Sequence, residues 1–154
     1  MILNSEEETI QFGKEFVKKL AGGEVIALTG DLGSGKTTFT QGLAKGLGIK
    51  DNITSPTFVV LKEYIIPKNS IHPFVHSSIR PVFVHIDAYR VNSIDDIKSA
   101  GIEDFLNRKD VIMVIEWAEK IKEILPKNII NINFKSVYPE SNRGENIREI
   151  KIIK

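Results

Sequence analysis

The sequence predicts an α/β domain in which helices cover both faces of a mainly parallel sheet. An apolar run at 25–28, a glycine-rich stretch at 30–37 and a helical pattern at 38–44 are typical of a strand, a loop and a helix in succession. Two further runs, 82–86 and 111–115, are nearly continuously apolar, as expected of parallel strands buried on both faces. Alternating strands and helices of this kind predict a three-layer sandwich.

The composition fits one domain without covalent cross-links. The chain has 154 residues, enough to bury about two-thirds of its unfolded surface, so we expect a single domain over 1–154. It has no cysteine, which excludes disulfides and thiolate metal sites. A formal net charge of +1 and the lack of a long basic block argue against an extended nucleic-acid surface. The acidic start and the short apolar runs lead us to expect a cytoplasmic protein without a membrane span.

The N-terminal half is expected to start with a helix. Ser5 and Glu8 have the spacing of a capping box, and apolar residues then recur at helical intervals up to the glycines at 22–23. Residues 58–64 are rich in β-branched and aromatic side chains and predict a strand. The proline-punctuated segment 65–81 is longer than most connections and predicts a surface excursion.

The C-terminal half adds short helices and two final strands. Residues 93–101 have the cap, the early acids and the glycine stop of a short helix, and one more turn is expected at 102–106. The pattern at 117–125 predicts another helix, which stops before a proline. Residues 128–134 and 147–153 predict strands that form an antiparallel appendage to the sheet.

The residues from Gly30 to Thr37 match every fixed position of the phosphate-binding loop G-x-x-x-x-G-K-[ST]. Its glycines permit backbone angles that turn successive N–H groups toward a phosphate, and the following helix adds its positive dipole end. We expect Lys36 to bridge the terminal phosphates and the Thr37 hydroxyl to bind Mg²⁺. The predicted fold is therefore of the P-loop NTPase kind.

Asp87 and Glu116 directly follow the two buried apolar runs. Carboxyl ends of parallel strands lie at one edge of a sheet, the edge that the phosphate loop also occupies, so both acids are expected beside the metal. A P-loop enzyme needs an acid near Mg²⁺ and, for hydrolysis, a group that orients water. The spacing leaves open which acid does which, and either could instead cap its strand.

Two other residues have alternative interpretations. Thr57 could sense the terminal phosphate, as hydroxyls do in nucleotide switches, or could belong to a Ser/Thr turn shaped by Pro56. Arg90 could stabilise transition-state charge or cap a helix.

The histidines do not predict a metal site. His72 and His76 are four apart, but Pro73 between them argues against the helix that would align them for zinc. His85 lies inside a predicted strand, where a core or edge role is expected. The segment 107–110 loosely resembles a guanine-reading motif but precedes a strand instead of following one, so adenine is expected by elimination.

Four motifs taken together resemble the TsaE family: residues 30–39, 55–58, 85–90 and 115–117, in family order. These are small bacterial ATPases required, with TsaD and TsaB, for making threonylcarbamoyladenosine in tRNA. The segment at 65–81 is longer than the family's usual link, and Arg148 lies in a closing strand that matches the family only loosely.

The resemblance implies that ATP and Mg²⁺ bind at the loop, with Thr37 and Glu116 near the metal and Asp87 in support. It also implies that Thr9 lies near the base or sugar. The residues expected to contact ATP are Thr9, Gly33, Ser34, Gly35, Lys36, Thr37 and Thr38. Those expected to take part in turnover are Lys36, Asp87 and Glu116, and those expected at the metal are Thr37, Asp87 and Glu116.

Three functions share these features. The first is an ATPase, slow alone and stimulated by TsaD and TsaB, which would contact tRNA mainly through that complex. The second is a small-molecule kinase, which would need several arginines in a lid, although 88–110 offers only Arg90 and Arg108. The third is a binding module that uses ATP to hold a shape without needing hydrolysis.

Overall fold

A computed structural model describes residues 1–56, 58–70, 80–137 and 147–153 of the chain. The strands are β1 (Ile2–Leu3), β2 (Val25–Gly30), β3 (Leu61–Ile65), β4 (Val82–Asp87), β5 (Val111–Glu116), β6 (Ile130–Val137) and β7 (Ile147–Ile153). The α-helices are α1 (Glu6–Val17), α2 (Lys36–Gly46) and α3 (Ile94–Ser99), and single 3₁₀ turns are η2 (Ile102–Asp104), η3 (Ala118–Lys120) and η4 (Lys122–Ile124).

The strands form one sheet in the order β1-β7-β6-β2-β5-β4-β3. Its centre, β6-β2-β5-β4, is parallel, and β7 joins β6 in antiparallel direction, which confirms the predicted parallel sheet with antiparallel C-terminal strands. Two antiparallel pairings were not predicted: β3 with β4, and the two-residue β1 with β7. A strand of two residues is too short to carry a periodic pattern, and direction depends on connections that residue patterns do not encode.

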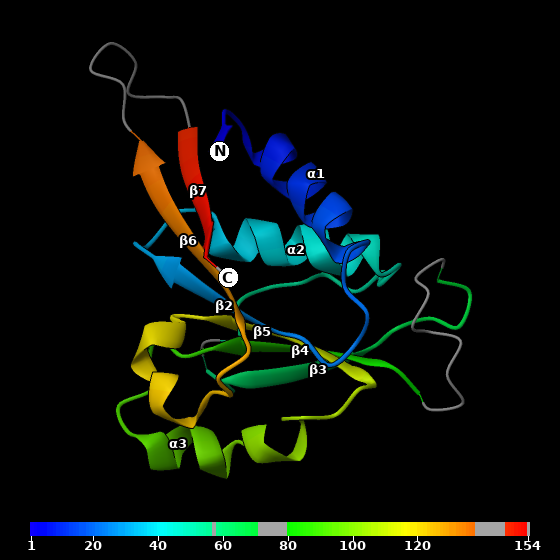
Figure 1. The fold of residues 1–154 in the computed structure, drawn as a ribbon, viewed down its shortest axis with the longest axis vertical. Coiled ribbons are helices and arrows are strands. Elements are labelled where there is room, and N and C mark those ends of the chain that lie inside the picture. Colours follow the sequence, from blue (N-terminus) through cyan, green and yellow to red (C-terminus); the bar gives the residue numbers. More distant parts are fainter. Residues whose placement is uncertain (57, 71–79, 138–146, 154) are drawn as a thin grey trace.

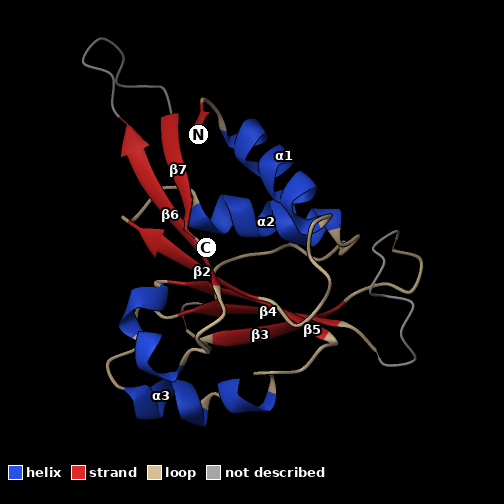
Figure 2. Cartoon of the chain, in the orientation of Figure 1, coloured by secondary structure: helices blue, strands red, loops and turns tan. Residues whose placement is uncertain are grey.

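Helices cover the two faces of this sheet as separate layers (Figures 1 and 2). The pair α1 and α2 packs on one face around Phe39 and Leu43, and α3 with the 3₁₀ turns packs on the other around Ile97 and Ile102. The predicted three-layer sandwich is thus confirmed. None of the described helices has the length and apolar character needed to cross a bilayer.

Strands β4 and β5 position the site. Every residue of both strands is buried, as their apolar sequences predicted. They pair in parallel with Asp87 opposite Glu116, so the two carboxylates end neighbouring strands at the same edge. The strand that leads into the phosphate loop, β2, pairs with β5 on its other side.

Two predicted elements differ in the structure. Residues 58–60 form a turn, and β3 starts only at Leu61, because Val60 has a left-handed backbone with φ of 65° that a strand cannot contain. The predicted helix at 117–125 is two single 3₁₀ turns. Trp117 is left-handed with φ of 59°, and Ile121 departs from helical angles between the turns, so helical hydrogen bonds cannot propagate.

The helix starts are close to their predictions. Ser5 caps α1 by accepting from the Glu8 N–H, but the Glu8 carboxylate accepts from Asn4 N and not from Ser5 N. A full reciprocal capping box occurs instead at α3, between Ser93 and Asp96.

Much of the predicted excursion at 65–81 lies outside the described residues, which end at 70 and resume at 80. Its two ends are tied to the fold, since the buried Ile66 donates its N–H to the Pro81 carbonyl at 3.0 Å.

Candidate functional site

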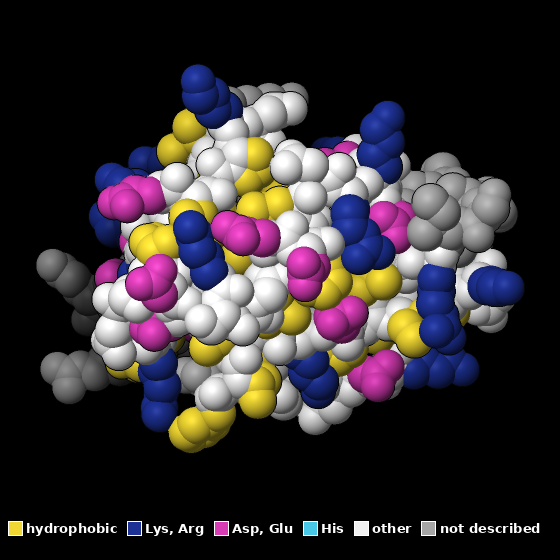
Figure 3. Space-filling model, turned by 90° about the horizontal axis from the view of Figure 1, so that it is seen from below, with side chains coloured by type: hydrophobic (Ala, Val, Ile, Leu, Met, Phe, Trp, Pro, Cys, Tyr) yellow, Lys and Arg dark blue, Asp and Glu magenta, His cyan; other side chains and the backbone are white. Residues whose placement is uncertain are grey.

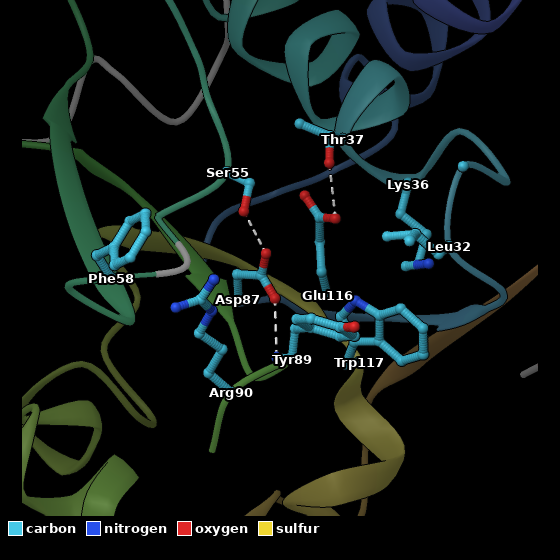
Figure 4. A pocket seen from close by; sticks show the side chains of 11 residues that line it. Leu32, Lys36, Thr37, Ser55, Phe58, Asp87, Tyr89, Arg90, Glu116 and Trp117 are labelled. Carbon is cyan, nitrogen blue, oxygen red and sulfur yellow. Dashed lines mark hydrogen bonds between the residues drawn. The ribbon is translucent and has the colours of Figure 1, made fainter.

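A pocket of about 320 Å³ opens at the carboxyl ends of β4 and β5, beside the start of α2 (Figure 4). The residues that line it are Leu32, Gly33, Lys36, Thr37, Ser55, Phe58, Asp87, Tyr89, Arg90, Glu116 and Trp117. They come from segments widely separated in the sequence and include the main residues that the motifs singled out. The pocket therefore lies where the sequence predicted a phosphate site.

The glycines of the loop have the backbone that a phosphate cradle needs. Gly33 and Gly35 have φ of 77° and 100°, which residues with a Cβ rarely adopt. Gly35 is the N-cap of α2 and offers no side chain to cap the helix. The N–H groups of the first turn of α2 are thus left without a side-chain acceptor, as at helix ends that bind anions.

Lys36 is 4 % exposed, and its ammonium lies against the loop. It donates to the carbonyls of Gly30 and Asp31 at 2.6 and 2.8 Å and lies 4.1 Å from the centre of the Trp117 ring. Burial lowers the pKa of Lys36, and the negative charge of Glu116 partly opposes that shift. The positive charge is therefore held at the pocket wall by groups that phosphate oxygens can replace.

Thr37 and Glu116 meet directly. The Thr37 hydroxyl donates to Glu116 Oε2 at 2.8 Å, and the other carboxylate oxygen, Oε1, lies 2.8 Å from Nε2 of His85. Glu116 is 2 % exposed and His85 is fully buried. The sequence suggested a core or edge role for His85, and the structure places it in contact with a predicted site carboxylate.

Asp87 has its own set of donors. The Ser55 hydroxyl donates to Oδ2, and the Tyr89 N–H donates to Oδ1 at 2.8 Å (Figure 4). Both carboxylate oxygens are thereby oriented from the loop before β3 and from the turn after β4. Ser55 belongs to a quoted motif, but its pairing with Asp87 was not predicted.

The donor set fits Mg²⁺ better than a transition metal. Mg²⁺ prefers oxygen ligands and commonly uses one or two carboxylates together with substrate phosphates. Thr37, Glu116 and Asp87 offer such oxygens around one pocket. In the described part of the chain there is no group of three or more His, Cys, Asp and Glu residues that could hold a metal without other ligands.

Thr9 lies apart from the carboxylates. It is fully buried, donates to the Ser5 carbonyl at 2.9 Å and accepts from Nη1 of Arg148 at 3.1 Å. Arg148 is 5 % exposed and packs on the loop so closely that a Cβ at Gly35 would lie 2.4 Å from its Nε. The sequence assigned Arg148 no role. The signal that marks it as inward-facing is its spacing of two from the buried Ile150.

The mouth of the pocket is apolar and aromatic. Leu32 and Phe58 are 74 % and 85 % exposed. The Tyr89 and Trp117 rings, whose centres lie 5.1 Å apart, line the same pocket. The Arg90 guanidinium lies 4.5 Å from the centre of the Phe58 ring, so Arg90 does line the pocket. Neither of its two predicted roles is tested by this contact.

Several other predictions have definite locations. Ser34 is buried within the loop, and Thr38 is half-buried in the first turn of α2. Arg108 and Asp110 form a bidentate ion pair at the amino end of β5, the opposite end from Glu116. Three residues lie outside the described part of the chain: Thr57, His72 and His76.

Comparisons with known proteins agree on one family. The model for "Threonylcarbamoyl adenosine biosynthesis protein TsaE" matches residues 3–144. A protein of Rickettsia prowazekii named tRNA threonylcarbamoyladenosine biosynthesis protein TsaE is 38 % identical over 134 residues, which cover 86 % of this chain and 83 % of the relative. The Bacillus subtilis protein of the same name is 36 % identical over 144 residues, covering 94 % and 78 %.

A solved structure also resembles the fold. The crystal structure of YdiB from Bacillus subtilis superposes with a TM-score of 0.71 and 30 % sequence identity, covering 97 % of this chain and 80 % of that one.

Proposed function

This chain is a member of the TsaE family, whose named relatives are proteins of tRNA threonylcarbamoyladenosine biosynthesis, and from this premise we propose that it serves that biosynthesis as a Mg²⁺-dependent ATPase. Its matched residues, 3–144, include the phosphate loop and both strand-end carboxylates. Its proposed partners are TsaD and TsaB, and its proposed location is the cytoplasm.

The contact between Thr37 and Glu116 carries this proposal. The two residues are 79 positions apart, yet the hydroxyl donates to the carboxylate at 2.8 Å next to the loop lysine. In P-loop NTPases a loop Ser/Thr and a strand-end acid hold Mg²⁺ between them. The arrangement supports binding of Mg·ATP, with the metal held by Thr37 and Glu116.

The residues of the loop bind and orient the phosphates. The N–H groups from Gly33 to Thr37 receive the phosphate oxygens, and Lys36 exchanges its bonds to Gly30 and Asp31 for bonds to those oxygens. Mg²⁺, when bound, supplies neutralisation of the charge that develops on the transferred phosphoryl group.

We assign to Asp87 the role of orienting the water molecule that attacks the terminal phosphate. Its two oxygens are oriented by the Ser55 hydroxyl and by the Tyr89 N–H. A carboxylate so fixed at the pocket floor can orient a water molecule for attack on the terminal phosphate. Glu116 is occupied by Thr37 and is therefore placed on the metal side.

The surroundings of the site support partner-dependent turnover. The exposed Leu32 and Phe58 surround the opening, where a partner protein would exclude water. Among the described residues that line the pocket Arg90 is the one arginine, which supports an ATPase over a kinase with an arginine-rich lid. On the face in Figure 3 acidic side chains lie among the basic ones, which supports tRNA contact mainly through the partners.

The decisive experiment measures phosphate release from Mg·ATP by the purified chain, alone and with TsaD and TsaB. We expect slow release alone and stimulation by the partners, because an incomplete P-loop site can be about 10³- to 10⁵-fold below its assisted rate. Lys36→Ala is the blank and should release none. Rapid turnover that ignores the partners would contradict the proposal.

Glu116→Gln separates hydrolysis from a static use of ATP. The amide keeps the shape of the side chain but removes its charge, so nucleotide should still bind while phosphate release is lost. A strain that carries this variant should lose threonylcarbamoyladenosine in its tRNA. Normal modification by the variant would favour the non-hydrolysing module.

A further inference from the structure

The proposed mechanism does not use His85, a buried polar side chain at the site. His85 lies in β4, two residues before Asp87, and is 0 % exposed. Its Nε2 lies 2.8 Å from Glu116 Oε1, and the two side chains are 0 % and 3 % exposed. A polar contact so completely shielded from water is strongly directional, because no solvent competes for either partner.

The direction of this hydrogen bond follows from the acceptor. An ionised carboxylate can only accept, so the proton must lie on Nε2 of His85. The other ring nitrogen, Nδ1, is buried and has no hydrogen-bond partner among the described residues. The contacts therefore place the donating N–H of the ring on Nε2, toward Glu116.

The register of the two strands explains why this bond matters. Asp87, not His85, lies directly opposite Glu116, and His85 pairs with Val114. Like charges directly opposite one another on neighbouring strands repel. The hydrogen bond from His85 holds the Glu116 carboxylate next to a residue of β4 that precedes Asp87 by two positions. Asp87 itself is held by Ser55 and by the Tyr89 N–H.

The Glu116 carboxylate is thus held from two sides. Oε1 accepts from His85 on β4, and Oε2 accepts from Thr37 on α2. A glutamate has three side-chain torsions, so two anchored oxygens define its orientation where one would not. With a metal ion bound, Thr37 would offer the ion its hydroxyl oxygen, and the bond from His85 would then keep the Glu116 carboxylate in its orientation.

We propose that His85 is a positioning residue for Glu116, holding its carboxylate at the orientation in which Oε2 and the Thr37 hydroxyl together receive Mg²⁺. The inference rests on the proposed function for the metal that the carboxylate receives, and the contact itself rests on the structure alone. It assigns to His85 no contact with ATP.

Three substitutions test the role of the donor. In His85→Gln the amide nitrogen can reach the position of Nε2, in His85→Asn it reaches only that of Nδ1, and in His85→Met no donor remains. We expect His85→Met and His85→Asn to need about 10- to 100-fold more Mg²⁺ for half-maximal turnover, with His85→Gln within about threefold of wild type. Binding of metal-free ATP should be unchanged in all three.

Nucleotide binding is measured apart from turnover by the fluorescence of Trp117, the sole tryptophan, which lines the same pocket. Mg²⁺ titrations of the complex with a slowly hydrolysed ATP analogue then give metal affinity apart from turnover. Equal metal affinity in wild type and His85→Met would overturn the proposal. So would equal losses in His85→Gln and His85→Met, which would indicate a packing role alone.

A measurement on the wild-type chain avoids any failure of the variants to fold. Nitrogen NMR of histidine-labelled protein has only three ring systems to assign. We expect His85 to be fixed with its proton on Nε2, and to lose that preference in Glu116→Ala. A proton on Nδ1 would overturn the proposal even if the chain never binds ATP, so this test is independent of the proposed function.

Discussion

Three buried carboxylates lie at ends of the central strands, and the donors around each one decide its role. Asp87 accepts from Ser55 and Tyr89, Glu116 accepts from Thr37 and His85, and both face the pocket. Asp110 lies at the other end of β5 and is paired with an arginine. Their sequence context, an acid beside an apolar run, is nearly the same. Neighbours supplied by other segments are what separate a site residue from a structural ion pair.

The Arg108–Asp110 pair should make stability depend on pH. The hydrogen bonds from Arg108 lower the pKa of Asp110 below its ordinary value. Its contribution to the free energy of unfolding is therefore complete above the unfolded value of about 3.9 and is lost as pH falls through the lower, folded pKa. Because Arg108 is 41 % exposed, we expect Asp110→Asn to cost about 1 kcal/mol or less at pH 7.

Urea unfolding at pH 7 and at successively lower pH checks this expectation. The gap between wild type and Asp110→Asn should narrow once the pH is below about 4, because the carboxylate then takes up a proton in the unfolded chain while it stays ionised in the folded one. Asp51→Asn, at an exposed loop position, is the matched control and should show little gap at any pH. A gap for Asp110→Asn that stays constant with pH would argue that the charge is not its source.

At the scale of elements, α2, the helix that begins at the phosphate loop, crosses α1 at a very short distance. A Cβ at Gly42 would lie 2.4 Å from the Ile10 carbonyl oxygen, and one at Gly13 would lie 2.6 Å from the Phe39 carbonyl oxygen. The two helix backbones therefore touch through glycines. This contact sets how closely α1 approaches α2, the helix that begins at the phosphate loop.

Gly42→Ala should consequently destabilise the fold. In an exposed helix the change would gain about 1 kcal/mol, but here the added methyl group meets backbone atoms that cannot rotate away. We expect a net loss of about 1–3 kcal/mol in the free energy of unfolding, measured by urea titration. Gln11→Ala, on the exposed side of α1, should change it by less than about 0.5 kcal/mol. A stabilised Gly42→Ala would mean that the helices can separate freely.

The whole molecule concentrates its predicted ligand chemistry at one edge of the sheet. Lys36, Thr37, Asp87 and Glu116 meet at the carboxyl edge, whereas the Arg108–Asp110 pair lies at the amino end of β5. Substitutions at the two edges should therefore have separable effects on ligand binding and on stability.

Thermal unfolding with a slowly hydrolysed Mg·ATP analogue tests that separation. A ligand at about 100 times its Kd stabilises a protein by about 2.7 kcal/mol, which raises Tm by about 5–10 °C for a chain of this size. We expect this rise in wild type and, from a lower starting Tm, in Asp110→Asn. Lys36→Ala should show none. A similar rise in Lys36→Ala would place the nucleotide elsewhere.

The loop residues 30–37 and the acids Asp87 and Glu116 could be found from the sequence alone, because each belongs to a contiguous stretch whose spacing expresses its local geometry. A glycine-rich loop between a strand and a helix, and an acid directly after a buried strand, are local patterns. The sequence by itself therefore determined the class of fold, the phosphate loop and the edge of the sheet at which the acids meet.

Only the tertiary structure decided which side chains pair between distant segments, around the two acids and elsewhere. The pairs His85–Glu116 and Arg148–Thr9 join residues 31 and 139 positions apart. The left-handed backbone of Trp117, which prevents the predicted helix from starting there, and the contact of its ring with Lys36 were likewise not predicted. Strand register and packing between distant segments create these contacts, and neither leaves a periodic trace in the sequence, because periodicity records only which face of its own element a residue occupies.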